Sequence, residues 1–165
     1  MSYTRFVAMI LTSTIVMFGL MYLNNYSWEH VFFSETRTYM ALYMGAVMAA
    51  IMLIFMLGSY ANRLANAAIF VSAAIVFSGS LYLVRSQATI DDESWMKAMI
   101  PHHSIAILTS SRAQLSDPRV QKLADAIIDA QKKEIAEMKA LIADLNSRTI
   151  PNGDGRARLS LWPQV

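Results

Sequence analysis

Two adjacent histidines, His102 and His103, stand beside methionines in the stretch from Trp95 to Ser104. Met99 precedes them by three and four residues, so on a helix its thioether lies next to both imidazoles. Imidazole and thioether together form a donor set for copper-type ions, because thioether sulfur prefers Cu(I) or Ag(I). Mg²⁺ and Ca²⁺ would need clustered oxygen ligands, which this face lacks. These residue types therefore indicate copper or silver chemistry.

A second helix must complete such a site, because adjacent histidines diverge by about 100° around a helix axis. Met138 lies at a seam position of the next amphipathic segment and is the natural further sulfur donor. Glu134, one turn away, is an oxygen ligand or the partner of an imidazole N–H. The predicted metal ligands are Met99, His102, His103 and Met138. The alternative is that both histidines only pack and hydrogen-bond within a helical bundle.

Two helices are needed to position these residues. Acids and a capping residue predict a helix from Asp91 to about Arg112, and Pro101 is expected to kink it beside the His pair. Asp117 and Pro118 predict a second start, with a helical pattern that continues to about Asn146. The sequence thus predicts a polar helical hairpin over 91–147 and a flexible tail over 148–165.

The second arm of this hairpin carries a heptad seam. Its members are Ala124, Ile128, Gln131, Ile135, Met138, Ile142 and Leu145, widened by Leu123, Ile127 and Leu141. Two helices cannot bury so wide a seam by themselves, so the hairpin needs a partner surface. A four-helix bundle made from two hairpins is the simplest solution. This predicts a homo-oligomer, or contact with a larger membrane complex.

Gln131 is a polar residue at a seam position. An unpaired buried amide would cost on the order of 1–3 kcal/mol, so a partner is expected. Gln131 either sets the register of the helices, as polar seam residues do in coiled coils, or supports a metal site.

The first part of the chain has a different character. Of the 165 residues of the whole chain, 55% are hydrophobic. Residues 1–90 hold four basic and two acidic residues, whereas residues 91–165 hold ten of each. Three uncharged segments approach the roughly 20 residues that cross a bilayer: Phe6 to Leu23, Tyr39 to Leu57 and Ala65 to Val84. We therefore expect an all-α protein with three transmembrane helices within residues 1–90.

The second span carries a methionine at every fourth position. The members are Met40, Met44, Met48, Met52 and Met56. Packing against lipid or neighbouring helices is the favoured interpretation, and a thioether track for Cu(I) is the alternative. Beside this stripe, Ala41, Gly45 and Ala49 form a small-residue row that lets another helix approach closely.

The segment before the second span is rich in aromatic residues. Tyr26, Trp28, Phe32 and Phe33 suit a belt at the membrane surface. His30 lies among them and is expected to be an interfacial residue, not a ligand.

Several function classes find no support. The net charge is only +2 and basic residues alternate with acids, so nucleic acid is not an expected partner. The chain has no cysteine, no phosphate-binding glycine loop, no Gly-x-Ser-x-Gly elbow and no His-Glu-x-x-His motif. A di-iron centre would need Glu-x-x-His motifs, which are also missing. We expect a protein that is not an enzyme.

The hairpin resembles the domain of unknown function 305 family. The resemblance covers roughly Asp91 to Leu145 and is carried by Met99-Ile100-Pro101-His102-His103, Ala106-Ile107, Leu123-Ala124, Ile127-Ile128, Gln131, Glu134-Ile135 and Met138. It implies a ferritin-like helical domain, often with two His-His hairpins, and some members are periplasmic proteins linked to copper or silver. By resemblance, the ligand positions are Met99, His102, His103 and Met138.

This chain departs from the family pattern in two ways. Ile105 and Thr109 stand where many members have further methionines, which argues against a high metal capacity. It also holds one hairpin where soluble relatives often hold two, which agrees with pairing between subunits.

Together these features predict a membrane-anchored protein that sequesters or delivers Cu(I), Cu(II) or Ag(I). The alternative is a structural or accessory subunit of a larger membrane complex. Arg5 and Arg63 flank one membrane surface and Arg37 and Arg85 the other, and the amino group tips the balance towards the Arg5 side as cytoplasmic. The expected location is a bacterial inner membrane, with the hairpin on the periplasmic side.

Overall fold

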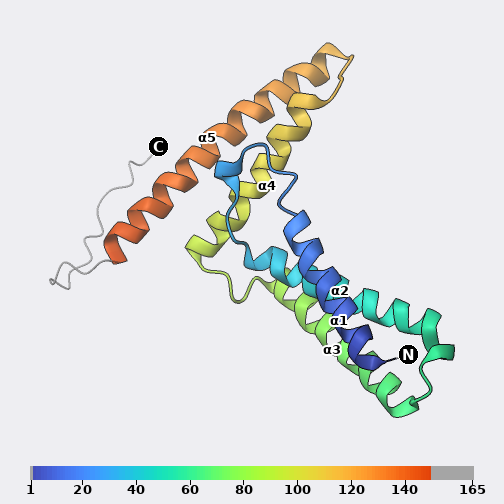
Figure 1. The fold of residues 1–165 in the computed structure, drawn as a ribbon. Coiled ribbons are helices and arrows are strands. Elements are labelled where there is room, and N and C mark those ends of the chain that lie inside the picture. Colours follow the sequence, from blue (N-terminus) through green and yellow to red (C-terminus); the bar gives the residue numbers. More distant parts are fainter. Residues whose placement is uncertain (1, 150–165) are drawn as a thin grey trace.

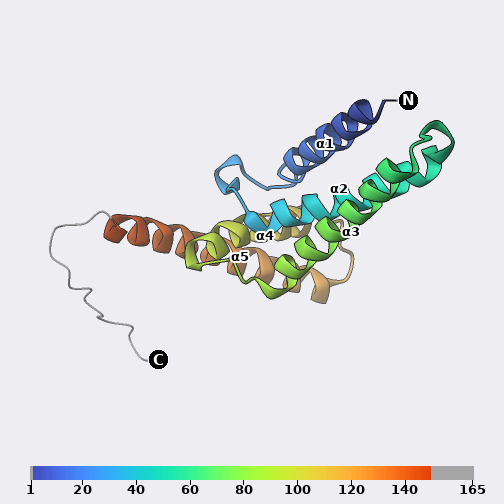
Figure 2. The ribbon, with the colours of Figure 1, turned by 90° about the horizontal axis from the view of Figure 1, so that it is seen from below.

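The fold consists of helices alone over residues 2–149, which a computed structural model describes (Figure 1). The elements are α1 (Tyr3–Leu20), η1 (Trp28–His30), α2 (Glu35–Met56), η2 (Leu57–Ser59), α3 (Arg63–Ser86), α4 (Asp92–Arg112) and α5 (Pro118–Thr149), where η denotes a 3₁₀ turn. Helices α1 to α3 form one group, and α4 and α5 form a pair that crosses one end of it (Figures 1 and 2). The predicted all-α class is confirmed.

Three helices are long and apolar enough to cross a membrane. They are Tyr3–Leu20, Glu35–Ser59 and Arg63–Ser86, which agrees with the three predicted spans. The second helix begins before the predicted Tyr39 because Ser34 caps it: the Ser34 hydroxyl accepts a hydrogen bond from the Arg37 N–H at 3.2 Å. Helix α3 is capped in the same way by Asn62, whose side chain accepts from the N–H groups of Leu64 and Ala65.

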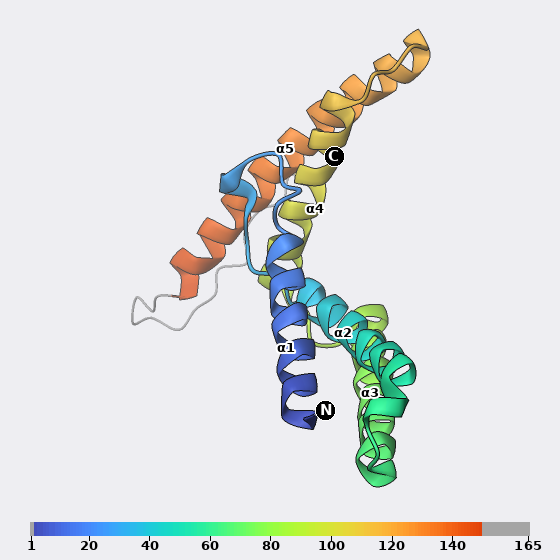
Figure 3. The ribbon, with the colours of Figure 1, turned by 45° about the vertical axis from the view of Figure 1, so that its right-hand side comes forward.

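Helix α2 lies between α1 and α3 and packs against both (Figure 3). Its predicted small-residue row explains the close approach of α1. A methyl group added at Gly45 would collide with the Thr14 hydroxyl, and the Thr14 methyl would be only 3.1 Å away. Because no other residue leaves this space, glycine is required where α1 and α2 meet.

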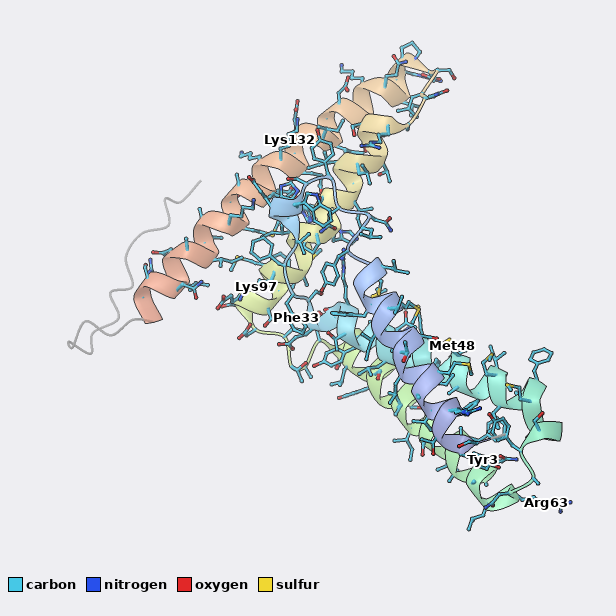
Figure 4. The ribbon with its side chains drawn as sticks, in the orientation of Figure 1. Tyr3, Phe33, Met48, Arg63, Lys97 and Lys132 are labelled. Carbon is cyan, nitrogen blue, oxygen red and sulfur yellow. The ribbon has the colours of Figure 1, made fainter. Side chains whose placement is uncertain are left out.

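Aromatic rings close the end of the group at which the chain begins. The Tyr60 ring lies 4.8 Å from the Tyr3 ring and 5.6 Å from the Phe6 ring, measured between centroids. The Tyr3 hydroxyl donates to the Asn66 side-chain oxygen at 2.8 Å, and the Asn66 amide donates to the Tyr60 carbonyl at 2.9 Å. Tyr3 and Arg63 mark this end in Figure 4. The buried Asn66 side chain is thereby paired, as a polar group in a membrane must be.

The connection between α1 and α2, residues 21–34, folds over the hairpin formed by α4 and α5 (Figure 1). Phe32 packs against the hairpin core, a contact that the sequence did not predict, and the expected aromatic belt at the membrane surface stays a prediction. Trp28 and Phe33 are 81% and 63% exposed. We call residues 21–34 the docking loop.

The base of the docking loop is fixed by Arg37. Its guanidinium donates to the Met21 carbonyl at 2.8 Å and lies 4.5 Å from the centre of the Tyr22 ring. The Tyr22 hydroxyl in turn accepts from the Ser34 N–H at 3.1 Å. This buried cation therefore joins the end of α1 to the start of α2.

The hairpin begins as predicted. The Asp91 carboxylate accepts from the Ser94 N–H at 2.8 Å, and this hydrogen bond holds the pKa of Asp91 below its usual value. Helix α4 continues without interruption through Pro101. The hairpin core consists of Met96, Ile100, Ile107, Ile135, Met138 and Ile142, so the predicted seam does face α4.

The docking loop covers only part of the apolar surface of the hairpin. Leu123, Ile127 and Leu141 remain 60%, 36% and 39% exposed. Completion of a four-helix bundle by a second copy stays a prediction. Of the predicted tail, residues 148 and 149 continue α5, and 150–165 lie outside the described residues.

We predict that Gly45→Val lowers the free energy of unfolding by about 1–3 kcal/mol, because the new side chain displaces Thr14 and α1. Thermal unfolding in detergent micelles measures the effect. Gly79→Val is the matched control, since a Cβ there meets nothing within 4 Å. Thr14→Ala in the Gly45→Val background should restore part of the loss. Equal midpoints for the two glycine variants would contradict the proposed close approach.

Candidate metal centre

His103 is held by both of its ring nitrogens. Nδ1 lies 2.9 Å from the carbonyl oxygen of Met99, one turn back on α4, and Nε2 lies 2.7 Å from Oε2 of Glu134 on α5. Both partners are acceptors, so the ring points an N–H at each of them when it is protonated. A bond from Nδ1–H to a backbone carbonyl also fixes the ring of many metal-binding histidines and leaves Nε2 as the donor atom.

Glu134 is more accessible than the histidine it contacts. Its side chain is 50% exposed, against 16% for His103. The same carboxylate oxygen accepts from the Gln131 amide at 3.5 Å. Gln131 therefore has the partner that was expected for it. It lies beside the His103–Glu134 pair, and its role in helix register or in a metal site stays a prediction.

His102 points elsewhere. It is exposed, its ring centroid lies 6.1 Å from that of His103, and the two ring planes meet at 66°. This divergence is what adjacent helix positions dictate. The His pair is thus not brought onto a single site within one chain.

The two predicted thioether ligands belong to the hairpin core. Met138 is 6% exposed and lies in the same cluster as Met96, and Met99 is partly buried against that cluster. Met99 is one turn from His103 on α4, and Met138 is one turn from Glu134 on α5. The structure therefore places Met99 and Met138 together in the core between the two helices, with the His103–Glu134 contact one turn away along α4 and α5, and leaves His102 outside.

Carboxylates and imidazoles alone do not assemble a metal site. Over residues 2–149, no group of three or more His, Asp or Glu side chains lies close enough to hold an ion. A metal ion bound here would therefore need sulfur from the core methionines, which is the donor type predicted for Cu(I) or Ag(I).

His30 has a role that the sequence analysis did not identify. Its Nδ1 lies 2.9 Å from the hydroxyl oxygen of Ser104 on α4, and the same oxygen accepts from the Tyr26 N–H at 2.7 Å. Ser104 is completely buried, and its hydroxyl joins α4 to the docking loop through both of these contacts. His30 thus helps to hold the docking loop against α4.

The surroundings of His30 favour the neutral form of its imidazole. Burial lowers the pKa of His30, the ammonium of Lys139 lowers it further, and Glu29 partly opposes them. Lys139 and Glu29 form a loose ion pair at 3.9 Å that spans α5 and the docking loop. A neutral imidazole is therefore favoured in the docked state.

Fold and site together define an α-helical protein with three membrane-length helices and a histidine- and methionine-bearing hairpin. Residues 83–157 match the model of a family described as "Domain of unknown function (DUF305)". A stretch of 64 residues of the chain is also similar to "Uncharacterized protein L153" of Acanthamoeba polyphaga mimivirus, with 44% identity. That match covers 38% of this chain and 42% of the viral protein, so it spans less than half of either. No solved structure matches the chain.

We predict that acid releases the docking loop. Because the folded pKa of His30 lies below 6.5, the unfolded chain takes up a proton first as the pH falls. The stabilisation is therefore complete above about pH 6.5 and is lost as the pH falls below that value. Hydrogen exchange at the Tyr26 amide, corrected for its intrinsic pH dependence, should show faster opening at about pH 5 than at about pH 7.5.

Three variants make this test specific. His30→Gln removes the titrating group and should abolish the difference between the two pH values. His102→Gln removes an exposed histidine and should behave as wild type. Ser104→Ala leaves the Tyr26 N–H without its acceptor and should open the loop at both pH values. If the Tyr26 amide of wild type is equally protected from exchange at both pH values, protonation of His30 does not control the docking of the loop.

Proposed function

We propose that this protein is a membrane-anchored metal-binding protein that sequesters or delivers copper or silver and catalyses no reaction. The proposed ligands, for Cu(I), Cu(II) or Ag(I), are Met99, His103 and Met138 of one chain, with His102 contributed by a second copy. The observation that carries the proposal is the setting of His103. Its Nδ1 is anchored to a backbone carbonyl, and its Nε2 faces an exchangeable, half-exposed carboxylate beside the thioether core.

The chemistry of the donor set supports a soft ion. Neutral imidazole accepts borderline metals, and thioether sulfur favours Cu(I) and Ag(I). Binding would exchange the Glu134 contact of His103 Nε2 for the metal and would release any proton held there. Methionine has three flexible torsions, so Met99 and Met138 can turn towards an ion without movement of the helices. Glu134 would remain as an oxygen ligand or as a hydrogen-bond partner.

The proposed setting is an integral protein of a bacterial inner membrane with the hairpin on the periplasmic side. Arg5 and Arg63 would then lie at the cytoplasmic surface, as the positive-inside rule favours. A second copy would cover the exposed Leu123, Ile127 and Leu141 of α5 in a four-helix bundle. Its His102 and Met99 would enlarge the donor set.

A structural role is the second candidate. The same three exposed leucine and isoleucine side chains could dock the hairpin on another subunit of a membrane complex. In that case the His103–Glu134 pair and Gln131 serve only to fix the two helices in register.

Titration of the full chain in detergent with Cu(I) and with Ag(I), against a competing chelator, tests the metal function. We expect stoichiometric binding by wild type. Loss of an outer-shell partner lowers metal affinity by roughly 10–100-fold, and His102→Ala/His103→Ala should lower it by more than that. Met99→Leu/Met138→Leu should have a comparable effect, because leucine keeps the apolar volume and removes the sulfur.

Membrane methionines supply the matched control. Met52→Leu/Met56→Leu removes two thioethers that pack against the cluster of Phe6, Leu53 and Tyr60 in the membrane part. This variant should bind as tightly as wild type. If the histidine variant and wild type bind equally, the metal function fails, and isolation of the intact native complex then tests the structural role.

A further inference from the structure

An apolar cavity of about 410 Å³ lies among the three membrane helices, away from the Met/His site. Its floor is formed by Phe6, Ala46 and Ala73, which are 2%, 7% and 8% exposed. Its rim is formed by exposed side chains such as Leu11 and Val76, at 57% and 40%. The cavity is therefore an open groove with a buried apolar floor, within the segments that can span a membrane.

The arrangement of the helices explains why this space exists. Helix α2 packs against both α1 and α3 (Figures 2 and 3), and residues of all three helices line the cavity. Gly45, Ala46 and Ala49 fill too little volume to close it. At one end α1 is fixed by the contacts of Tyr3 and Phe6 with Tyr60 and by the hydrogen bond from Tyr3 to Asn66 of α3.

The size of the cavity selects its occupant. The volume of the cavity is in the range of ordinary ligand pockets, about 300–1,000 Å³, and a chain of methylene groups fits it. Left empty, the lining atoms would lose their dispersion contacts.

The charge at one end of the helices indicates which lipid is favoured. Arg5 and Arg63 are both exposed there, close in sequence to the lining residues Phe6 and Ala68. The acidic residues of the first 90 positions are Glu29 and Glu35, which lie at the opposite end, beside the hairpin. Anionic headgroups are attracted to such uncompensated basic residues. We propose that the cavity binds one acyl chain of an anionic phospholipid, with its phosphate group at Arg5 and Arg63.

The test uses the full chain reconstituted in vesicles of equal phosphatidylglycerol and phosphatidylcholine, then extracted in mild detergent. Native mass spectrometry counts the phospholipid that remains bound. Wild type should retain phosphatidylglycerol in preference to phosphatidylcholine. Ala49→Leu/Ser72→Leu fills the cavity and should reduce retention about tenfold, the effect of about two methylene groups that lose apolar contact.

Two further variants separate the acyl-chain contact from the headgroup contact. Ala74→Leu/Ser78→Leu adds the same bulk at exposed α3 positions outside the cavity and should retain lipid as wild type does. Arg5→Gln/Arg63→Gln leaves the cavity unchanged and should remove the preference for phosphatidylglycerol.

Several results would overturn the proposal. No retained phospholipid in wild type would do so, as would equal retention after the cavity is filled, or a copy of this chain or another protein bound in place of lipid. If Ala49→Leu/Ser72→Leu does not fold, the arginine variant decides: an unchanged preference for phosphatidylglycerol refutes the headgroup contact. None of these outcomes depends on whether the hairpin binds metal.

Discussion

The buried hydroxyl of Ser104 joins parts of the chain that are 78 and 74 residues apart, the Tyr26 N–H and the His30 imidazole. Release of the docking loop from α4 would break both of these hydrogen bonds at the buried Ser104 hydroxyl. The same contact keeps Phe32 in the hairpin core. Because the loop is also the link between α1 and α2, this hydroxyl ties the hairpin to the membrane helices, together with the hydrogen bond from Ser94 on α4 to Glu35 on α2.

The docking loop and the His103–Glu134 contact engage different residues of the hairpin. The loop contacts Ser104 and Lys139, whereas His103 meets the half-exposed Glu134. In the proposed function, an exchange of partner at His103 Nε2 would leave these two loop contacts in place. Since Gln131 donates to the same Glu134 oxygen, the carboxylate keeps a partner when His103 releases it. In the proposed function, this separation would let the His103–Glu134 contact coexist with a ligand role for His103.

Local signals predicted most of the fold. Asp91, Ser94 and the apolar periodicity located α4, the heptad positions located the buried side of α5, and composition located the three membrane-length helices. Docking of residues 21–34 on α4 was not predictable, because it depends on a serine and a histidine of ordinary type that are far apart in sequence. Gln131 was different: Glu134 is three residues away on the same helix, so its partner could have been read from the spacing.

Burial divides the proposed ligands in a way that bears on how an ion would be held. His102 is exposed and His103 is 16% exposed, whereas Met138 is 6% exposed inside the core. In the proposed function an ion meets imidazole nitrogen at the surface before sulfur beneath it. A soft ion gains from the further step, because thioether sulfur suits Cu(I) and Ag(I), while a hard ion does not. Selectivity would then come from the depth of the sulfur atoms, since only an ion that sulfur stabilises can draw Met138 away from its apolar contacts.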